Sequence, residues 1–312
     1  MKEVLKRSES KELVLIQSLN KRLVFSNEEK QYFYYLRKGD QGEKYWADVL
    51  NRLSNDVLIL HDLTLNHKQT VFQIDTVCIF QKVVLSFEVK NYEGDFQLKP
   101  NDLWISSSGA EIKSPMLQVR RSESMLRQLF QSLRLNLPIE YYLVFVHPEF
   151  MLYDAPSDQK IIFPPQINRF IKTLNQKDSS LSQDHYKLAS QLISLNAKYI
   201  KSEPFIQYKY EQLKKGVWCK KCSKPLIPGY NCLYCSYCYI EYPIGGAILS
   251  YIEELLLLFP NIKITTNQIF DWCGEIISKK VIQKVLNSNF KKMGENRHSY
   301  YVKAECDSKK NF

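Results

Sequence analysis

The chain has 312 residues, more than a single hydrophobic core usually organises, so two or three modules are expected. Apolar residues make up 45% of the sequence, and this content excludes a wholly disordered chain. The formal net charge is +10, from 43 Lys and Arg against 33 Asp and Glu. This excess favours a polyanionic partner, first nucleic acid and second an acidic membrane surface.

The sequence lacks the patterns of secreted and membrane-spanning proteins. Residues 1–10 are charged throughout and hold no apolar segment of the kind that a secretory signal needs. No later apolar run approaches the roughly 18 residues that span a bilayer. We therefore expect a soluble, cytoplasmic protein that inserts into no membrane.

The N-terminal part has two helical patterns. Apolar residues recur at spacings of three and four over residues 1–36, which predicts a helical arm, residues 1–37, that packs on the next domain. Residues 39–54 carry a second stripe of this kind. An amphipathic helix is expected there, with Glu43 in its first turn.

The middle of the chain alternates between strand and helix patterns. Three β-rich runs lie at residues 57–65, 71–80 and 82–91. Their short turns predict an antiparallel meander. Residues 115–135 then have a helical rhythm that opens on a proline, and residues 139–147 form an apolar run of strand length. The order helix, three strands, helix, strand predicts a compact α/β unit over residues 38–150.

The second half of the chain divides into three parts. Residues 151–212 are polar and helix-prone, and we expect a helical extension or linker there. Cysteines crowd into residues 213–243. Residues 244–312 show the order helix, helix, turn, helix, β-ribbon, which predicts a winged-helix-like domain.

Acidic residues on two neighbouring strands are the sharpest chemical signal. Glu88 and Lys90 lie two apart on one strand and therefore share a face, while Phe87 and Val89 point into the core. If the second and third strands pair about a short turn, Asp75 falls nearly opposite Glu88. Two converging carboxylates suit Mg²⁺, which keeps waters and substrate phosphate oxygens among its ligands. Such a site fits phosphodiester hydrolysis.

At these residues the sequence resembles the PD-(D/E)xK nuclease superfamily and, within it, the nuclease-related domain known as NERD. The resemblance covers residues 38–147 and implies a restriction-endonuclease-like αβββαβ core. Ile74 stands where the superfamily name has a proline. Further matching segments are Gly42-Glu43, Asn91-Tyr92-Glu93-Gly94, Trp104 and Ser114-Pro115-Met116-Leu117-Gln118.

The resemblance implies a role for each matching residue. Asp75 and Glu88 would bind Mg²⁺ or Mn²⁺, and Lys90 would orient or activate the attacking water. Glu43 would contact a water on the metal, and Gln118 would position DNA or such a water. The expected activity is metal-dependent hydrolysis of phosphodiester bonds, first of all in DNA, during DNA processing, repair or defence.

The same residues also allow roles without catalysis. Glu88 and Lys90 could form a salt bridge on a solvated sheet face, Glu43 suits any helix N-terminus, and Gln118 could be an exposed helix residue. Two alternative functions are a non-catalytic DNA-binding or regulatory protein built on a nuclease fold, and an RNA-directed nuclease. Because no P-loop motif occurs, energy-driven unwinding would need a helicase or another DNA-processing partner. Homo-oligomer formation is open as well.

Cysteines with metal-ligand spacing form the second signal. Cys219 and Cys222 make one C-x-x-C pair, and three more cysteines leave the second pair open. Cys235 with Cys238 is favoured, and Cys232 with Cys235 is the alternative. Four thiolates in two pairs are the ligands of a structural zinc ribbon. A redox motif would need a thioredoxin-like context, which this segment lacks.

Basic residues near the cysteines and in the C-terminal module are candidates for nucleic-acid binding. They are Lys214, Lys215, Lys220, Lys221, Lys279, Lys280, Lys284 and Arg297. Four tyrosines of the cysteine-rich segment could stack on bases or fill the small core of the ribbon: Tyr230, Tyr234, Tyr237 and Tyr239.

Overall fold

The computed structural model describes residues 2–156, 160–197, 205–295 and 299–303. Two compact units make up the chain. The first comprises Met1–Ser10 and Tyr34–Glu203, and the second comprises Lys11–Phe33 and Pro204–Phe312. Arg297 lies outside the described residues.

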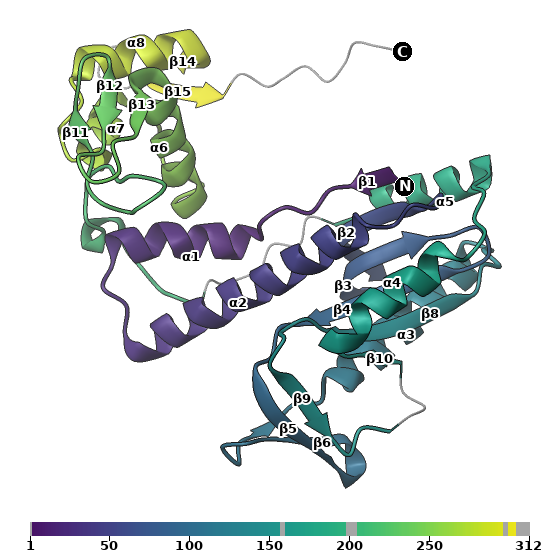
Figure 1. The fold of residues 1–312 in the computed structure, drawn as a ribbon. Coiled ribbons are helices and arrows are strands. Elements are labelled where there is room, and N and C mark those ends of the chain that lie inside the picture. Colours follow the sequence, from purple (N-terminus) through teal and green to yellow (C-terminus); the bar gives the residue numbers. More distant parts are fainter. Residues whose placement is uncertain (1, 157–159, 198–204, 296–298, 304–312) are drawn as a thin grey trace. The chain divides into compact units, whose positions relative to one another are not determined.

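A six-stranded mixed sheet forms the centre of the first unit (Figure 1). Strands β2, β3 and β4 pair in antiparallel fashion, which confirms the predicted meander. Strands β1, β8 and β10 extend the sheet by parallel pairing with β2, β4 and β8 in turn. In spatial order the strands are β1 (Lys2–Leu5), β2 (Leu58–His67), β3 (Thr70–Ile79), β4 (Val84–Lys90), β8 (Ile139–Phe145) and β10 (Ile161–Ile162).

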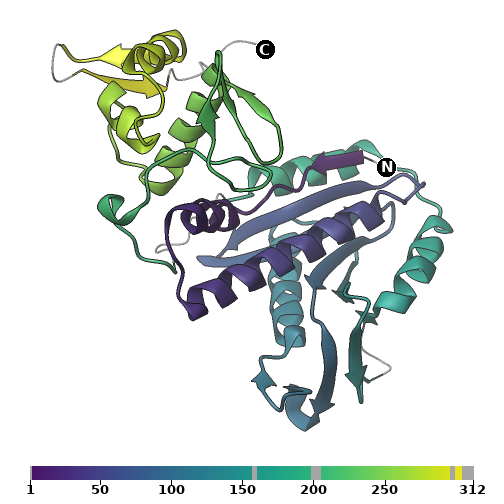
Figure 2. The same ribbon diagram turned by 60° about the vertical axis from the view of Figure 1, so that its left-hand side comes forward.

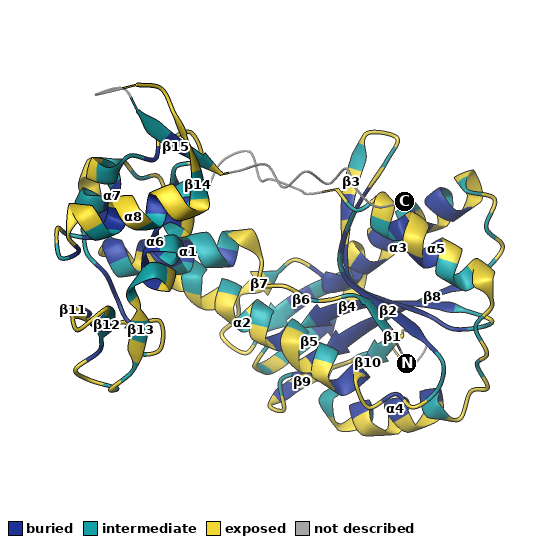
Figure 3. Ribbon diagram, turned by 90° about the horizontal axis from the view of Figure 1, so that it is seen from above, coloured by how far each residue is buried: buried dark blue, intermediate teal, exposed yellow. Residues whose placement is uncertain are grey.

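Helices cover both faces of this sheet, so its central strands are buried (Figure 3). Helices α2 (Asn27–Leu50) and α4 (Ile167–Asn175) pack on one face, and α3 (Pro115–Ser132) and α5 (Gln183–Ser194) pack on the other. Burial on two faces explains why most residues of β4 and β8 are apolar. A charged residue inside these strands is therefore conspicuous.

A second, four-stranded sheet extends from one end of the first unit (Figure 2). It is built from the segment after β4 and from the strand after β8, in the order β7, β6, β5, β9. Its strands are β5 (Gly94–Lys99), β6 (Leu103–Ser106), β7 (Glu111–Ile112) and β9 (Phe150–Tyr153). Short 3₁₀ turns lie at Pro100–Asp102 and Pro164–Gln166.

The fold of this unit is thus mixed α/β, and the predicted elements occur in the predicted order. The restriction-endonuclease-like assignment itself stays a prediction. Helix α2 begins twelve residues before the expected residue 39, at Asn27. Its first half is rich in Glu, Lys and Gln, which favour a helix without making an apolar stripe.

The second unit contains helix α1 (Lys11–Arg22), a small three-stranded sheet and a C-terminal group of helices with a β-ribbon. The small sheet has β11 (Ile227–Pro228), β12 (Cys232–Tyr234) and β13 (Glu241–Pro243), and a 3₁₀ turn at Tyr210–Gln212 precedes it. The C-terminal group has α6 (Ile244–Leu258), α7 (Thr266–Trp272), α8 (Lys279–Asn289), β14 (Phe290–Met293) and β15 (Tyr300–Lys303). This order matches the expected one, while the winged-helix assignment stays a prediction. Within the described residues, no helix has both the length and the apolar character that crossing a bilayer requires.

Arg22 ties helix α1 into the second unit. Its guanidinium lies 2.5 Å from a carboxylate oxygen of Glu254 and donates to the carbonyl of Lys214 at 3.0 Å. It also lies over the rings of Trp218 and Trp272, with centroids at 4.5 and 3.5 Å. Residues 11–33 therefore belong with the C-terminal part, whereas the sequence suggested an arm packing on the neighbouring domain.

We expect the substitution Arg22→Met to destabilise the second unit by about 3 kcal/mol, because it leaves Glu254 without its buried partner. Chemical denaturation followed by tryptophan fluorescence would measure the loss, since Trp218 and Trp272 report on this unit. Lys21→Met, on the same helix, is the matched control and should change stability little. Equal stability of the two variants would contradict a structural role for Arg22.

Candidate functional site

Asp75 on strand β3 is paired with neither of the two neighbouring strands. The pairing of β3 with β4 ends at Thr76, opposite Phe87. The pairing with β2 continues on either side of Asp75 but skips that residue. The Asp75 carboxylate instead accepts a hydrogen bond from the backbone N–H of Val89, at 2.8 Å. The carboxylate thus takes the place of the backbone carbonyl that would accept this hydrogen bond in a regular ladder, and the bond holds the side chain beside β4.

Strand β4 places Glu88 and Lys90 next to this carboxylate. Continuing the register by one residue sets Asp75 opposite Glu88, as the sequence predicted. The Lys90 ammonium donates to Glu88 at 2.6 Å and to the side-chain oxygen of Gln118 at 3.1 Å. Gln118 stands in the first turn of α3, which Pro115 opens. The structure therefore brings Asp75, Glu88, Lys90 and Gln118 together from three elements.

Asp62 on β2 lies across from Asp75 at the point where the ladder is interrupted. Its φ angle is +54°, in the left-handed region, which breaks the regular strand there. Its carboxylate accepts a hydrogen bond from the backbone N–H of Ser8 at 3.2 Å. An acidic residue in a strained conformation beside Asp75 marks this position as part of the same cluster.

Glu43 reaches the cluster from helix α2 and is paired with Arg7. The guanidinium of Arg7 lies 3.2 Å from Glu43 and also forms a short ion pair with Asp40, one turn earlier. Arg7 follows strand β1, whose pairing with β2 brings the residue to this place. The segment after β1 thus neutralises the part of the acidic cluster that Lys90 does not contact.

The carboxylates resist ionisation because they are buried together. Burial and the charge of Asp75 raise the pKa of Glu43 and of Glu88 to about 8. Burial also raises the pKa of Asp75 and that of Asp62. Burial lowers the pKa of Lys90, but Glu88 and Asp75 outweigh it and raise the pKa above its usual value.

Such a cluster favours the approach of a cation. Negative charges held close together in a poorly hydrated place repel each other, and a divalent cation would relieve that repulsion. The donor set is made of carboxylate oxygens, which Mg²⁺ prefers. In the described part of the chain, however, no three carboxylates bring their oxygens within 4.8 Å of one another.

Arg7 and Asp62 are the two members of this site that the sequence did not reveal as such. Asp62 gave a weak signal, because it is a charge inside the apolar run of residues 57–65. Arg7 gave no sequence signal, because it stands among other charged residues near the N-terminus. His61 is buried beside the site: its Nδ1 lies 3.0 Å from the Thr76 hydroxyl, and burial lowers its pKa to about 4.

Four cysteines of the second unit form a cluster that could hold a metal ion. The sulfur atoms of Cys219, Cys222, Cys235 and Cys238 all lie within 4.8 Å of one another. Three of the separations are 3.4, 3.5 and 3.7 Å. A tetrahedral zinc ion with Zn–S bonds of about 2.3 Å would need sulfurs roughly 3.8 Å apart, so the set fits zinc. Cys232, the alternative ligand, is not a member of this cluster.

Hydrogen bonds favour the thiolate form at Cys219. Burial opposes ionisation there, but the Tyr242 hydroxyl at 3.2 Å and the backbone N–H groups of Cys222 and Lys221 lower the pKa to about 6. Thiolates are the form that binds metal. Three of the four tyrosines considered above, Tyr230, Tyr237 and Tyr239, are exposed to 101%, 69% and 77%, so they are not core residues of the ribbon.

The candidate basic residues differ in how far they reach solvent. Lys214, Lys220 and Lys221 are exposed beside the cysteines. On α8 the exposed lysines are Lys279, Lys280 and Lys284. Lys215 is engaged within its own unit, where its ammonium donates to the Tyr210 carbonyl and lies 3.3 Å from the centroid of that ring.

No curated protein and no solved structure matches this chain. Residues 38–146, however, match the family model described as the nuclease-related domain, NERD. The match confirms the resemblance drawn from the motif residues and spans Glu43, Asp75, Glu88, Lys90 and Gln118. Arg7 and the cysteine cluster lie outside it. The chain therefore carries a nuclease-related domain over residues 38–146.

Proposed function

We propose that the protein is a metal-dependent nuclease that hydrolyses phosphodiester bonds, with DNA as its first substrate. The observation that carries this proposal is the break of the sheet at Asp75, which sets its carboxylate beside Glu88 and Lys90. Nothing in the packing of the sheet requires two acids and a lysine there. Their burial costs stability, and a catalytic role accounts for that cost.

Each residue of the site has a distinct task. Asp75 and Glu88 would hold Mg²⁺ or Mn²⁺, which when bound polarises the phosphoryl oxygen and lowers the pKa of water. Lys90 stands within hydrogen-bond distance of Glu88 and Gln118, so it can orient a water and offset negative charge that develops on the phosphate. Gln118 keeps the Lys90 ammonium directed toward the site. Glu43, whose pKa is raised to about 8, can accept and release a proton near neutral pH.

The second unit would hold the nucleic acid. Zinc on the four cysteines would fix the small sheet, which is too short to build a core of its own. Exposed lysines at 214, 220 and 221 offer contacts to phosphates, and Tyr230 and Tyr237 offer aromatic faces to bases. Lys279, Lys280 and Lys284 of α8 offer a second set of phosphate contacts. An RNA substrate fits the same surface chemistry and is an outcome of the cleavage test below.

We expect Asp75→Asn and Lys90→Met to lower the rate of cleavage by about 100-fold or more, because each removes a charge that acts in the transition state. Asparagine can still accept the hydrogen bond of the Val89 N–H, so the strand should keep its place. The measurement is cleavage of plasmid, single-stranded DNA and RNA with Mg²⁺, Mn²⁺ or EDTA. Asp48→Asn, at an exposed position of α2, is the control. Binding without cleavage under all conditions would favour a non-catalytic, DNA-binding role.

Metal-free protein should lose stability as the pH rises. In the folded chain the pKa values of Glu43 and Glu88 are about 8, above the ordinary 4.5. Their contribution to the free energy of unfolding is therefore complete below about pH 4.5 and is lost as the pH rises through about 8. Mg²⁺ should offset the loss, since it stabilises the ionised carboxylates. Thermal unfolding at about pH 6 and about pH 8.5 should therefore show the larger rise in Tm with Mg²⁺ at the higher pH. A rise that is the same at both values, or that survives in Asp75→Asn, would place the ion elsewhere.

One zinc ion per chain is expected in protein purified without chelators. Cys222→Ser and Cys238→Ser should each release it, because a tetrahedral site that loses one of four thiolates binds far more weakly. Zinc released by a thiol-blocking reagent can be measured with a colorimetric chelator. Cys232→Ser is the matched control within the same segment and should keep its zinc. Loss of zinc in Cys232→Ser with retention in Cys238→Ser would assign the alternative ligand.

A further inference from the structure

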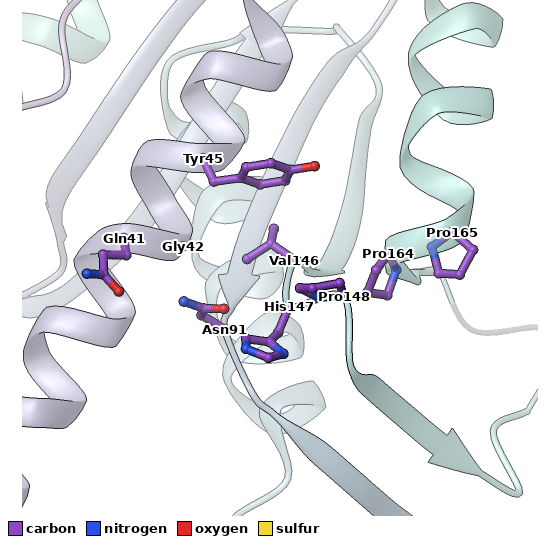
Figure 4. A pocket seen from close by; sticks show the side chains of 9 residues that line it. All are labelled: Gln41, Gly42, Tyr45, Asn91, Val146, His147, Pro148, Pro164 and Pro165. Atoms are coloured by element: carbon purple, nitrogen blue, oxygen red, sulfur yellow. The ribbon is translucent and has the colours of Figure 1, made fainter.

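A pocket of about 500 Å³ lies in the first unit, at the carboxyl ends of the parallel strands β4 and β8 (Figure 4). Ligand sites of proteins commonly have this size, and the carboxyl ends of parallel strands are a common place for them. Nine residues line the pocket: Gln41, Gly42, Tyr45, Asn91, Val146, His147, Pro148, Pro164 and Pro165.

The pocket and the acidic site share two stretches of chain. Gly42 lines the pocket and Glu43, the next residue, faces the carboxylates. Asn91 lines the pocket and follows Lys90 directly. A Cβ atom at Gly42 would lie 2.7 Å from Cβ of Asn91, so helix α2 touches the end of β4 there. The pocket and the acidic site therefore lie at neighbouring positions of α2 and of the end of β4.

The walls of the pocket are mostly uncharged and partly flat. His147, whose Nε2 lies 3.6 Å from a carboxylate oxygen of Glu93, is the one lining residue that can carry a positive charge. Among the nine lining residues there is no carboxylate, ammonium or guanidinium group. Val146 and the three prolines provide apolar surface, and the Tyr45 ring extends across the pocket toward Pro164 and Pro165 (Figure 4). Tyr45 is 44% exposed, so its ring is open to a ligand. An ion would gain little in such a place, whereas a flat, neutral group would stack on the ring.

One polar group of the pocket has a fixed direction. The Asn91 side-chain N–H donates to the backbone carbonyl of Lys38 at 2.7 Å, which settles the orientation of the amide. Its oxygen then lies on the side of Val146 and His147 (Figure 4). It offers a hydrogen-bond acceptor, which suits the exocyclic amino group of adenine, cytosine or guanine.

We propose that this pocket binds an unpaired nucleobase of the substrate strand, from the nucleotide beside the scissile phosphate. The base stacks on Tyr45, and its amino edge donates to Asn91. A base in a stacked, paired duplex cannot enter, so the substrate must be single-stranded or locally open at the cut. The inference rests on the proposed nuclease function, because it uses the acidic site to place the phosphate.

The test compares Tyr45→Ala with wild type on oligonucleotides in which one base at a time near the cut is removed. Tyr45→Ala should lower kcat/KM by about 5- to 100-fold on the intact strand, the range expected for one lost base stack. On the strand that lacks the base held in the pocket, wild type and variant should cleave equally. Tyr45→Phe should cleave like wild type, since the ring is kept. Tyr153→Ala, which removes another exposed tyrosine of the same unit, should change nothing.

A binding measurement separates this inference from the proposed function. A 2-aminopurine base moved along the strand should be quenched by wild type at one position and not by Tyr45→Ala, whether or not the strand is cut. Cleavage that depends on Asp75 but ignores both Tyr45 and every missing base would overturn the pocket and keep the nuclease. Quenching that depends on Tyr45, with no cleavage in any metal, would overturn the nuclease and keep the pocket.

Discussion

The interruption of the sheet at Asp75 is the constraint on which the acidic site depends. A residue inside a regular ladder has its backbone bonded to both neighbours and its side chain packed against a covering helix. Asp75 is excluded from both registers, and its carboxylate bonds to the Val89 N–H instead. The left-handed turn of the chain at Asp62 makes the same break on the other side. The break brings acids from β2, β3 and β4 to one place and leaves the rest of the sheet as an apolar scaffold.

Burying several carboxylates together costs free energy, and two basic residues, Lys90 and Arg7, offset part of their charge. Lys90 belongs to the same strand as Glu88 and contacts it directly, so it comes with the nuclease-related domain. Arg7 lies outside that domain and pairs with Asp40 and Glu43 on α2. Because Glu43 keeps a pKa near 8 even beside Arg7, the balance is incomplete in the protein alone. A divalent cation bound there would favour ionisation of carboxylates that burial otherwise keeps protonated.

How much of this could be predicted from the sequence depended on the distance between partners along the chain. The meander and the placement of Asp75 opposite Glu88 followed from apolar alternation and one short turn, both local features. The cysteines of the candidate metal site could be predicted as well, because each C-x-x-C pair is a local pattern: Cys219 with Cys222, and Cys235 with Cys238. Arg7 and Arg22 could not be predicted, because each finds its partners through tertiary packing: Glu254 is 232 positions from Arg22. A charge near the N-terminus carries no periodicity that tells an exposed residue from a buried one.

The pocket and the acidic site are linked by one close contact between helix α2 and the end of strand β4. Gly42 lets α2 approach Asn91 so closely that an added methyl group would have to displace one of them. The same contact fixes Glu43 on one side of the helix and Tyr45 on another, so a single close approach sets the spacing between the acids and the stacking surface. In the proposed nuclease a substrate phosphate would lie at Lys90, and an uncharged base would fit the pocket, where its desolvation costs little. A nucleotide joins a charged phosphate to an uncharged base, so it would use both regions at once.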